Sequence, residues 1–152
     1  MPFDLAEQRR WKRRLVEDAL GRIAGLGDLK VDELVVGKSS LGYRNRIELT
    51  LGHDAAGRPV IGMHEGWGRG LVDVEACLVQ HDDANAVLAT VRELLLDGPE
   101  HESRFRTDDP YRLVIRRSWA GGQIVVAIRE TAGPFPEFDD LADEIRTRHP
   151  EV

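Results

Sequence analysis

The chain has 152 residues, of which 41% are hydrophobic and 32% are charged, and it contains 15 glycines, 7 prolines and one cysteine. These values are typical of a soluble folded protein and exclude collagenous, disordered and disulfide-stabilised classes. The net charge of −6 argues against nucleic-acid binding over the whole surface. We expect one domain over residues 1–152.

The charge is unevenly distributed along the chain. Residues 1–50 carry 10 Lys and Arg against 8 Asp and Glu (+2), residues 51–96 carry 3 against 7 (−4), and residues 97–152 carry 8 against 12 (−4). An anion-binding face is therefore expected in the first third, although an ordinary surface with uneven charge explains the numbers too.

Targeting and membrane signals are not found in the sequence. No stretch approaches the roughly 18 apolar residues of a membrane span, and the N-terminus lacks the basic-then-apolar order of a secretory signal. We expect a cytoplasmic protein with no membrane partner.

A helix is expected from about Leu5 to Leu26, ended by Gly25 and Gly27. Its first half contains RRWKRR, residues 9–14, five cations where the helix dipole disfavours positive charge. Either a functional basic face or a solvated face paired with nearby acids accounts for this run. The apolar residues that recur at helical spacing are Trp11, Leu15, Ala19, Ile23 and Leu26.

Two β-hairpins are expected next. RIELTLG, residues 46–52, alternates between apolar and polar side chains, and VIGMHE, residues 60–65, is the returning strand. LVDVEACLVQ, residues 71–80, begins as a short extended segment. The second hairpin is YRLVIRRSWAGGQIVVAIRE, residues 111–130, which turns at its glycine pair.

Two further helices complete the expected fold. Residues 81–96 have apolar side chains at helical spacing, and residues 136–150 have acids early and arginines late, which suits the helix dipole. The sequence therefore predicts an α+β fold, an antiparallel sheet built from two hairpins with about three helices packed on it.

Local motifs for catalysis or metal binding are weak. GWGRG, residues 66–70, lacks the spacing of a phosphate-binding loop and is more consistent with a tight turn. The five histidines are scattered, without metal-ligand spacing. Cys77 is the only cysteine, and a buried structural thiol explains it better than a nucleophile does.

The segment GYRNRIELTLG, residues 42–52, is the most unusual short stretch. Arg44 and Arg46 lie two apart on the expected strand, so both guanidiniums should project from its solvated face, with Tyr43 at the entrance. This arrangement suits phosphate binding with base stacking nearby. Two exposed arginines that pair with acids such as Glu48 remain the alternative.

The order of motifs resembles the central domain of the RNA uracil-5-methyltransferase family, whose members methylate C5 of uridine in ribosomal or transfer RNA. The resemblance extends from about Ala6 to Val152. The motifs that carry it are GYRNRIELTLG, IGMHE, LVDVEACLVQ, RLVIRRSWAGGQIVVAIRE and FPEFDDLADEIRTRHPEV.

The resemblance implies a longer parent enzyme with an oligonucleotide-binding barrel before this domain and an S-adenosylmethionine-binding domain after it. Many members hold a [4Fe-4S] cluster, and Cys77 matches the fourth ligand. Three ligand cysteines and the catalytic nucleophile and base of the family have no counterpart in these residues. We therefore expect a fragment with no cofactor and no methyltransferase activity of its own, although its parent is an enzyme.

The same resemblance implies a role in rRNA or tRNA substrate handling, with 23S rRNA as the first expectation. The RNA-binding residues that we predict are Arg44, Asn45, Arg46, His64 and Arg69. Arg44 and Arg46 would hold phosphates beside the target uridine, Asn45 would fix the local backbone, and the other two would line the same groove. A free-standing RNA- or protein-binding module without catalysis is the alternative.

Overall fold

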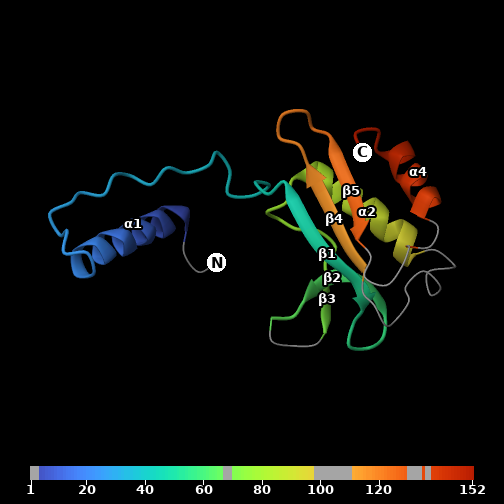
Figure 1. The fold of residues 1–152 in the computed structure, drawn as a ribbon, viewed down its shortest axis with the longest axis horizontal. Coiled ribbons are helices and arrows are strands. Elements are labelled where there is room, and N and C mark those ends of the chain that lie inside the picture. The colour runs from blue at the N-terminus through green and yellow to red at the C-terminus, as the bar shows by residue number, and fades with distance from the viewer. Residues whose placement is uncertain (1–3, 67–69, 98–110, 130–134, 136–137) are drawn as a thin grey trace. The chain divides into compact units, whose positions relative to one another are not determined.

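The computed structural model describes residues 4–66, 70–97, 111–129, 135 and 138–152 (Figure 1). It forms two compact units, Met1–Lys38 and Ser39–Val152, and each is described by itself. The expected single domain over residues 1–152 stays a prediction.

The first unit contains helix α1, Leu5–Arg22. Asp4 caps its N-terminus, because the Asp4 side chain accepts a hydrogen bond from the backbone N–H of Glu7 at 2.7 Å. Within the basic run, Arg13 pairs with Glu17 at 2.9 Å, as the solvated-face reading expects. No residue of α1 is buried, so the apolar stripe predicted from the sequence is exposed.

Helix α1 ends four residues before the predicted Leu26. Gly25 has a φ of +67°, a conformation that residues with a Cβ rarely adopt, and it turns the chain out of the helix. The backbone N–H of Leu26 then donates to the carbonyl of Leu20 at 2.9 Å. The glycines therefore lie just beyond the end of the helix, and the predicted end at Leu26 was four residues too late.

The second unit contains a five-stranded antiparallel sheet in the order β3-β2-β1-β4-β5 (Figure 1). The two predicted hairpins form its β2-β1 and β4-β5 pairs, and β3 adds an edge strand. The strands are β1 Arg46–His53, β2 Pro59–His64, β3 Leu71–Asp73, β4 Tyr111–Arg117 and β5 Ile124–Arg129.

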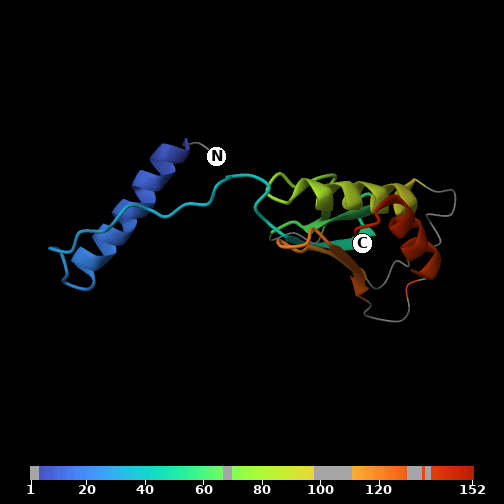
Figure 2. The ribbon, with the colours of Figure 1, turned by 90° about the horizontal axis from the view of Figure 1, so that it is seen from above.

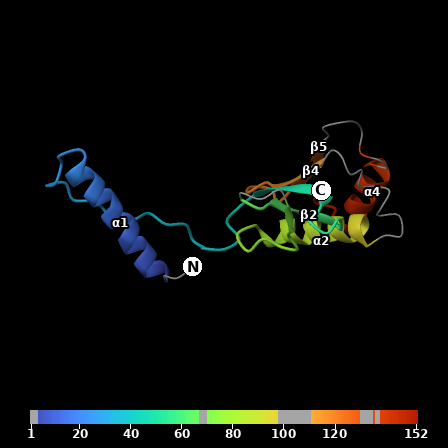
Figure 3. The same cartoon turned by 90° about the horizontal axis from the view of Figure 1, so that it is seen from below.

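The described part of the same unit contains two helices, α2 at Asp82–Leu96 and α4 at Phe138–Arg148. Both lie within two residues of the predicted spans. Figures 2 and 3 show α2 running along one face of the sheet. The α+β fold with an antiparallel sheet is confirmed.

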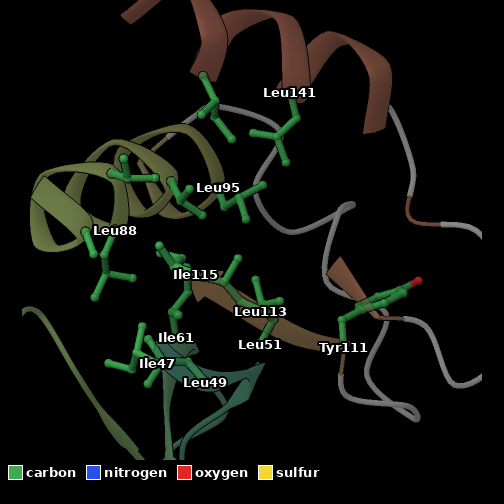
Figure 4. Close-up of a cluster of buried hydrophobic side chains, with 14 of the residues drawn as sticks. Ile47, Leu49, Leu51, Ile61, Leu88, Leu95, Tyr111, Leu113, Ile115 and Leu141 are labelled. Atoms are coloured by element: carbon green, nitrogen blue, oxygen red, sulfur yellow. The ribbon is translucent and has the colours of Figure 1, made fainter. Parts of the chain in front are cut away.

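The hydrophobic core lies between this sheet face and the helices (Figure 4). Alternation along β1 directs Ile47, Leu49 and Leu51 to the core, as the sequence predicted. Leu88 and Leu95 of α2 meet them and are fully buried. Among the described residues, no helix is long and apolar enough to cross a membrane.

The opposite sheet face is called the open face below. Figure 1 looks onto it, with α2 behind the sheet. Alternation and strand register assign nine residues other than glycine from the three strands β1, β4 and β5 to this face. They are Arg46, Glu48, Thr50, Arg112, Val114, Arg116, Val125, Ala127 and Arg129.

Candidate nucleic-acid interface

The segment that enters β1 is fixed by backbone hydrogen bonds on both sides. The N–H of Arg44 donates to the carbonyl of Val79 at 2.7 Å, and its carbonyl accepts from the N–H of His81 at 3.1 Å. The carbonyl of Asn45 accepts from the N–H of Arg117 at 2.8 Å. The backbone that presents the predicted RNA-binding arginines is therefore held between the segment before α2 and the end of β4.

Arg44 and Arg46 are both exposed, as predicted. Only Arg46 belongs to β1, however, because Arg44 lies before the strand and forms an isolated β-bridge with Gln80. Arg46 donates from Nη2 to Oε2 of Glu48 at 2.5 Å. The other oxygen of Glu48, Oε1, accepts from Nη1 of Arg112 on β4 at 2.8 Å. Glu48 thus bridges two arginines of the open face.

This bridge changes the acidity of Glu48. The hydrogen bonds from Arg112 and then Arg46 hold the pKa of the Glu48 carboxyl below its ordinary value. The alternative reading, in which the strand arginines pair with Glu48, is therefore correct for Arg46. It does not apply to Arg44, which has no ion-pair partner in the described part of the chain.

The other predicted RNA-binding residues differ in placement. His64 is exposed at the end of β2, and the register places it on the open-face side of the sheet. Asn45 is half-buried, and its carbonyl, rather than its side chain, makes the contact that fixes the backbone. Arg69 lies outside the described residues.

Sequence reasoning missed the arginines of β4 and β5. Arg112, Arg116 and Arg129 lie on the open face because of their register with β1. The alternation of RLVIRR, in which arginines flank Val114 at two-residue spacing, was the signal that could have identified the first two.

Cys77 is half-buried and packs against the hydrophobic core. The side chain of Asn85 in α2 holds its backbone from both sides. The N–H of Cys77 donates to Oδ1 of Asn85 at 3.0 Å, and Nδ2 of Asn85 donates to the carbonyl of Cys77 at 3.1 Å. No group of three or more potential metal ligands is present among the described residues. The role of Cys77 as a fourth cluster ligand stays a prediction.

Comparison with known proteins identifies related sequences, although no protein-family model matches the chain. An uncharacterized RNA methyltransferase from Halalkalibacterium halodurans is 32% identical over 152 residues, covering 93% of this chain and 31% of the relative. Another, from Nostoc sp., is 29% identical and covers 93% of this chain and 31% of the relative. The chain therefore spans about a third of the length of these relatives.

A solved structure has a similar fold. The tRNA (uracil-54, C5)-methyltransferase of Pyrococcus abyssi, in complex with S-adenosyl-L-homocysteine, matches with a TM-score of 0.63 over 91% of this chain and 32% of that protein, at 20% identity. This likeness agrees with the motif order found in the sequence and with the relatives named RNA methyltransferases. These relatives and this fold support the resemblance of the chain to the RNA uracil-5-methyltransferase family.

Proposed function

We propose that the chain is a substrate-handling segment of an S-adenosylmethionine-dependent RNA uracil-5-methyltransferase. The observation that carries this proposal is the pair of exposed arginines, Arg44 and Arg46, on a backbone segment that is fixed on both sides. Relatives named RNA methyltransferases and the tRNA methyltransferase neighbour support RNA as the partner. We take 23S rRNA as the first substrate to test and tRNA as the second.

The work of such a segment is to hold the RNA while the target base is exposed. A base of structured RNA must be unstacked before it reaches a nucleophile, which costs a few kcal/mol. Charge-assisted hydrogen bonds from Arg44 and Arg46 to phosphates beside the base would offset this cost. Arg46 must exchange Glu48 for a phosphate, whereas Arg44 is already available.

Two cofactors of the family bear on this proposal. S-adenosylmethionine would supply the methyl group in the whole protein, as the S-adenosyl-L-homocysteine complex of the neighbour indicates for that enzyme. A [4Fe-4S] cluster needs four ligands, and the chain has one cysteine, Cys77. The residues of this chain therefore do not fit a complete cluster, and the proposed role uses none.

RNA binding by the 152-residue chain tests the proposal. We expect fluorescently labelled 23S rRNA hairpins to bind with an affinity that falls steeply with salt, and Arg44→Ala and Arg46→Ala each to weaken binding and reduce the salt slope. Arg146→Ala is the matched control because this exposed arginine belongs to α4 and pairs weakly with Asp143 at 3.5 Å. If Arg44→Ala and Arg46→Ala both bind RNA with the affinity and salt slope of the unaltered chain, the assignment is wrong.

A methylation assay addresses the rest of the proposal. The chain incubated with radiolabelled S-adenosylmethionine and unmodified rRNA or tRNA should transfer no methyl group, whereas the longer protein that contains it should form 5-methyluridine. Absence of 5-methyluridine from the RNA treated with the longer protein would favour a binding module without catalysis.

A further inference from the structure

We propose that the RNA contact extends beyond the two predicted arginines and covers the open face of the sheet, where four arginines, together with Arg44 just before β1, bind successive phosphates of one single-stranded RNA segment. The inference rests on the proposed function and names the surface that holds the substrate. We call these residues the arginine face: Arg44, Arg46, Arg112, Arg116 and Arg129.

Strand register brings these arginines together from distant parts of the sequence. Arg46 of β1 is the direct cross-strand partner of Arg116 of β4. Arg112 of β4 is the direct partner of Arg129 of β5. Directly opposite side chains in an antiparallel pair have Cβ atoms about 5 Å apart and share one face of the sheet. Two arginine pairs therefore lie side by side across three neighbouring strands.

Such pairs do not serve the stability of the sheet. Like charges placed directly opposite each other destabilise an antiparallel pair. The sequence accepts this arrangement twice, at Arg46 with Arg116 and at Arg112 with Arg129. A bound polyanion would offset the repulsion between the paired arginines, because each of them would then lie beside a negative charge. RNA binding therefore explains an arrangement that the stability of the sheet does not explain.

The acids of the open face do not neutralise its cations. Glu48 is the one carboxylate among the nine open-face residues defined above, and it is already bonded to Arg46 and Arg112. Arg116 and Arg129 have no ion-pair partner in the described part of the chain. The arginine face carries five positive charges against this one carboxylate, a local +4 on a chain whose net charge is −6.

The dimensions of the surface fit a single strand. Arg112 and Arg116 are four residues apart on β4, or about 13 Å at 3.3 Å per residue. The three strands add about 10 Å of width at 4.8 Å per strand. Among the described residues no helix projects from this face to enter a groove, and the exposed ring of Tyr43 beside Arg44 offers a stacking partner for a base.

The test measures RNA binding by the full chain over a range of salt concentrations, with an unstructured fluorescent RNA of about 12 nucleotides, a size within the site range of such surfaces. The double variant Arg116→Ala/Arg129→Ala should bind about tenfold more weakly or worse, with a salt slope reduced by about 1.4, because each phosphate contact to a single strand contributes about 0.7. The Arg146→Ala control should match the unaltered chain.

A gain-of-function variant complements this loss. Glu48→Gln removes the carboxylate that occupies Arg46 and Arg112, so both guanidiniums become available to phosphate. We expect Glu48→Gln to bind RNA more tightly and with a steeper salt slope than the unaltered chain. Misfolding would weaken binding, so it cannot produce this result.

The outcomes separate this inference from the function on which it rests. If Arg44→Ala and Arg46→Ala weaken RNA binding while Arg116→Ala/Arg129→Ala and Glu48→Gln leave it unchanged, the arginine face is wrong and the proposed function stands. The same result would be expected if β4 and β5 faced an acidic protein surface instead. At about 20 mM salt, electrostatic attraction between protein and RNA is only weakly screened. If the unaltered chain binds no RNA even there, both the inference and the proposed function fail.

Discussion

Asp73 at the end of β3 and Arg92 in α2 form a double hydrogen bond between carboxylate and guanidinium. Nη1 of Arg92 donates to Oδ1 of Asp73 at 2.6 Å and Nη2 donates to Oδ2 at 2.8 Å. Nη1 also reaches the carbonyls of Ile61 at 3.3 Å and Val74 at 3.1 Å. One guanidinium therefore joins the edge strand, its neighbour and the helix that covers the sheet.

The first prediction concerns Asp73→Asn. The bond from Arg92 lowers the pKa of the Asp73 carboxyl, so the folded state favours its ionised form. The stabilisation is present above the ordinary value of about 3.9 and is lost as pH falls through the lower, folded-state pKa. Asp73→Asn should lower the free energy of unfolding by about 1–2 kcal/mol at pH 7, since the pair is partly exposed.

Urea unfolding of both proteins between pH 7 and pH 2 measures this effect. The difference between them should be constant from pH 7 to about pH 5 and should shrink below about pH 4. A difference that persists unchanged at pH 2 would contradict the pairing as its cause.

The second prediction concerns Gly62 of β2, which approaches β3 closely. A Cβ built at Gly62 would lie 2.0 Å from the carbonyl oxygen of Val72, a backbone atom that cannot rotate away. Gly62→Ala should therefore separate β3 from β2 and cost about 1–3 kcal/mol of unfolding free energy. Gly66→Ala is the matched control, because a Cβ there meets no atom of the described residues within 4 Å. Faster hydrogen exchange of the β3 amides in Gly62→Ala alone would identify the site of damage.

Much of this fold follows from short-range patterns in the sequence. Alternation along residues 46–52 was sufficient to predict β1 and its buried side, because each strand residue faces away from its neighbours. The apolar spacing of residues 81–96 was sufficient for α2, five of whose residues are fully buried. The same spacing predicted an apolar face for α1 that is not buried, because periodicity shows which residues share a face and not what covers it.

The candidate site was less accessible to sequence reasoning. Arg44 and Arg46 were identified because they lie two residues apart in one short segment of the sequence. Arg116 and Arg129 were missed because their proximity to Arg46 and Arg112 depends on the register between strands. Register is set by the hairpin turns and by the pairing of β1 with β4. The end of β1 at His53 and the start of β4 at Tyr111 are 58 positions apart in the sequence. A pattern confined to one strand carries no information on that pairing.

The third prediction concerns the core between α2 and the sheet. Leu88 is fully buried in the hydrophobic cluster (Figure 4). Leu88→Ala removes its contacts and leaves a cavity, so the free energy of unfolding should fall by about 2–5 kcal/mol. Leu78→Ala is the matched control, because that side chain is 78% exposed and should change stability by less than about 0.5 kcal/mol. Equal losses in the two variants would contradict the described packing.

The fourth prediction concerns the loop that carries Cys77. Asn85 holds the N–H and the carbonyl of Cys77 together, so removing its side chain should let the loop open more often. Two hydrogen bonds at roughly 1 kcal/mol each correspond to about a tenfold or greater increase in the open population. Asn85→Ala should therefore raise the alkylation rate of the Cys77 thiol by about tenfold under native conditions.

Asn45→Ala provides the control for this experiment. Asn45 is also half-buried, but its side chain makes no hydrogen bond in the described part of the chain. Its variant should therefore leave the alkylation rate of Cys77 unchanged. If both variants react at the rate of the unaltered chain, Asn85 does not control access to the thiol. A faster reaction in Asn85→Ala alone would show that α2 sets the position of Cys77, the residue that the family resemblance assigns to a cluster.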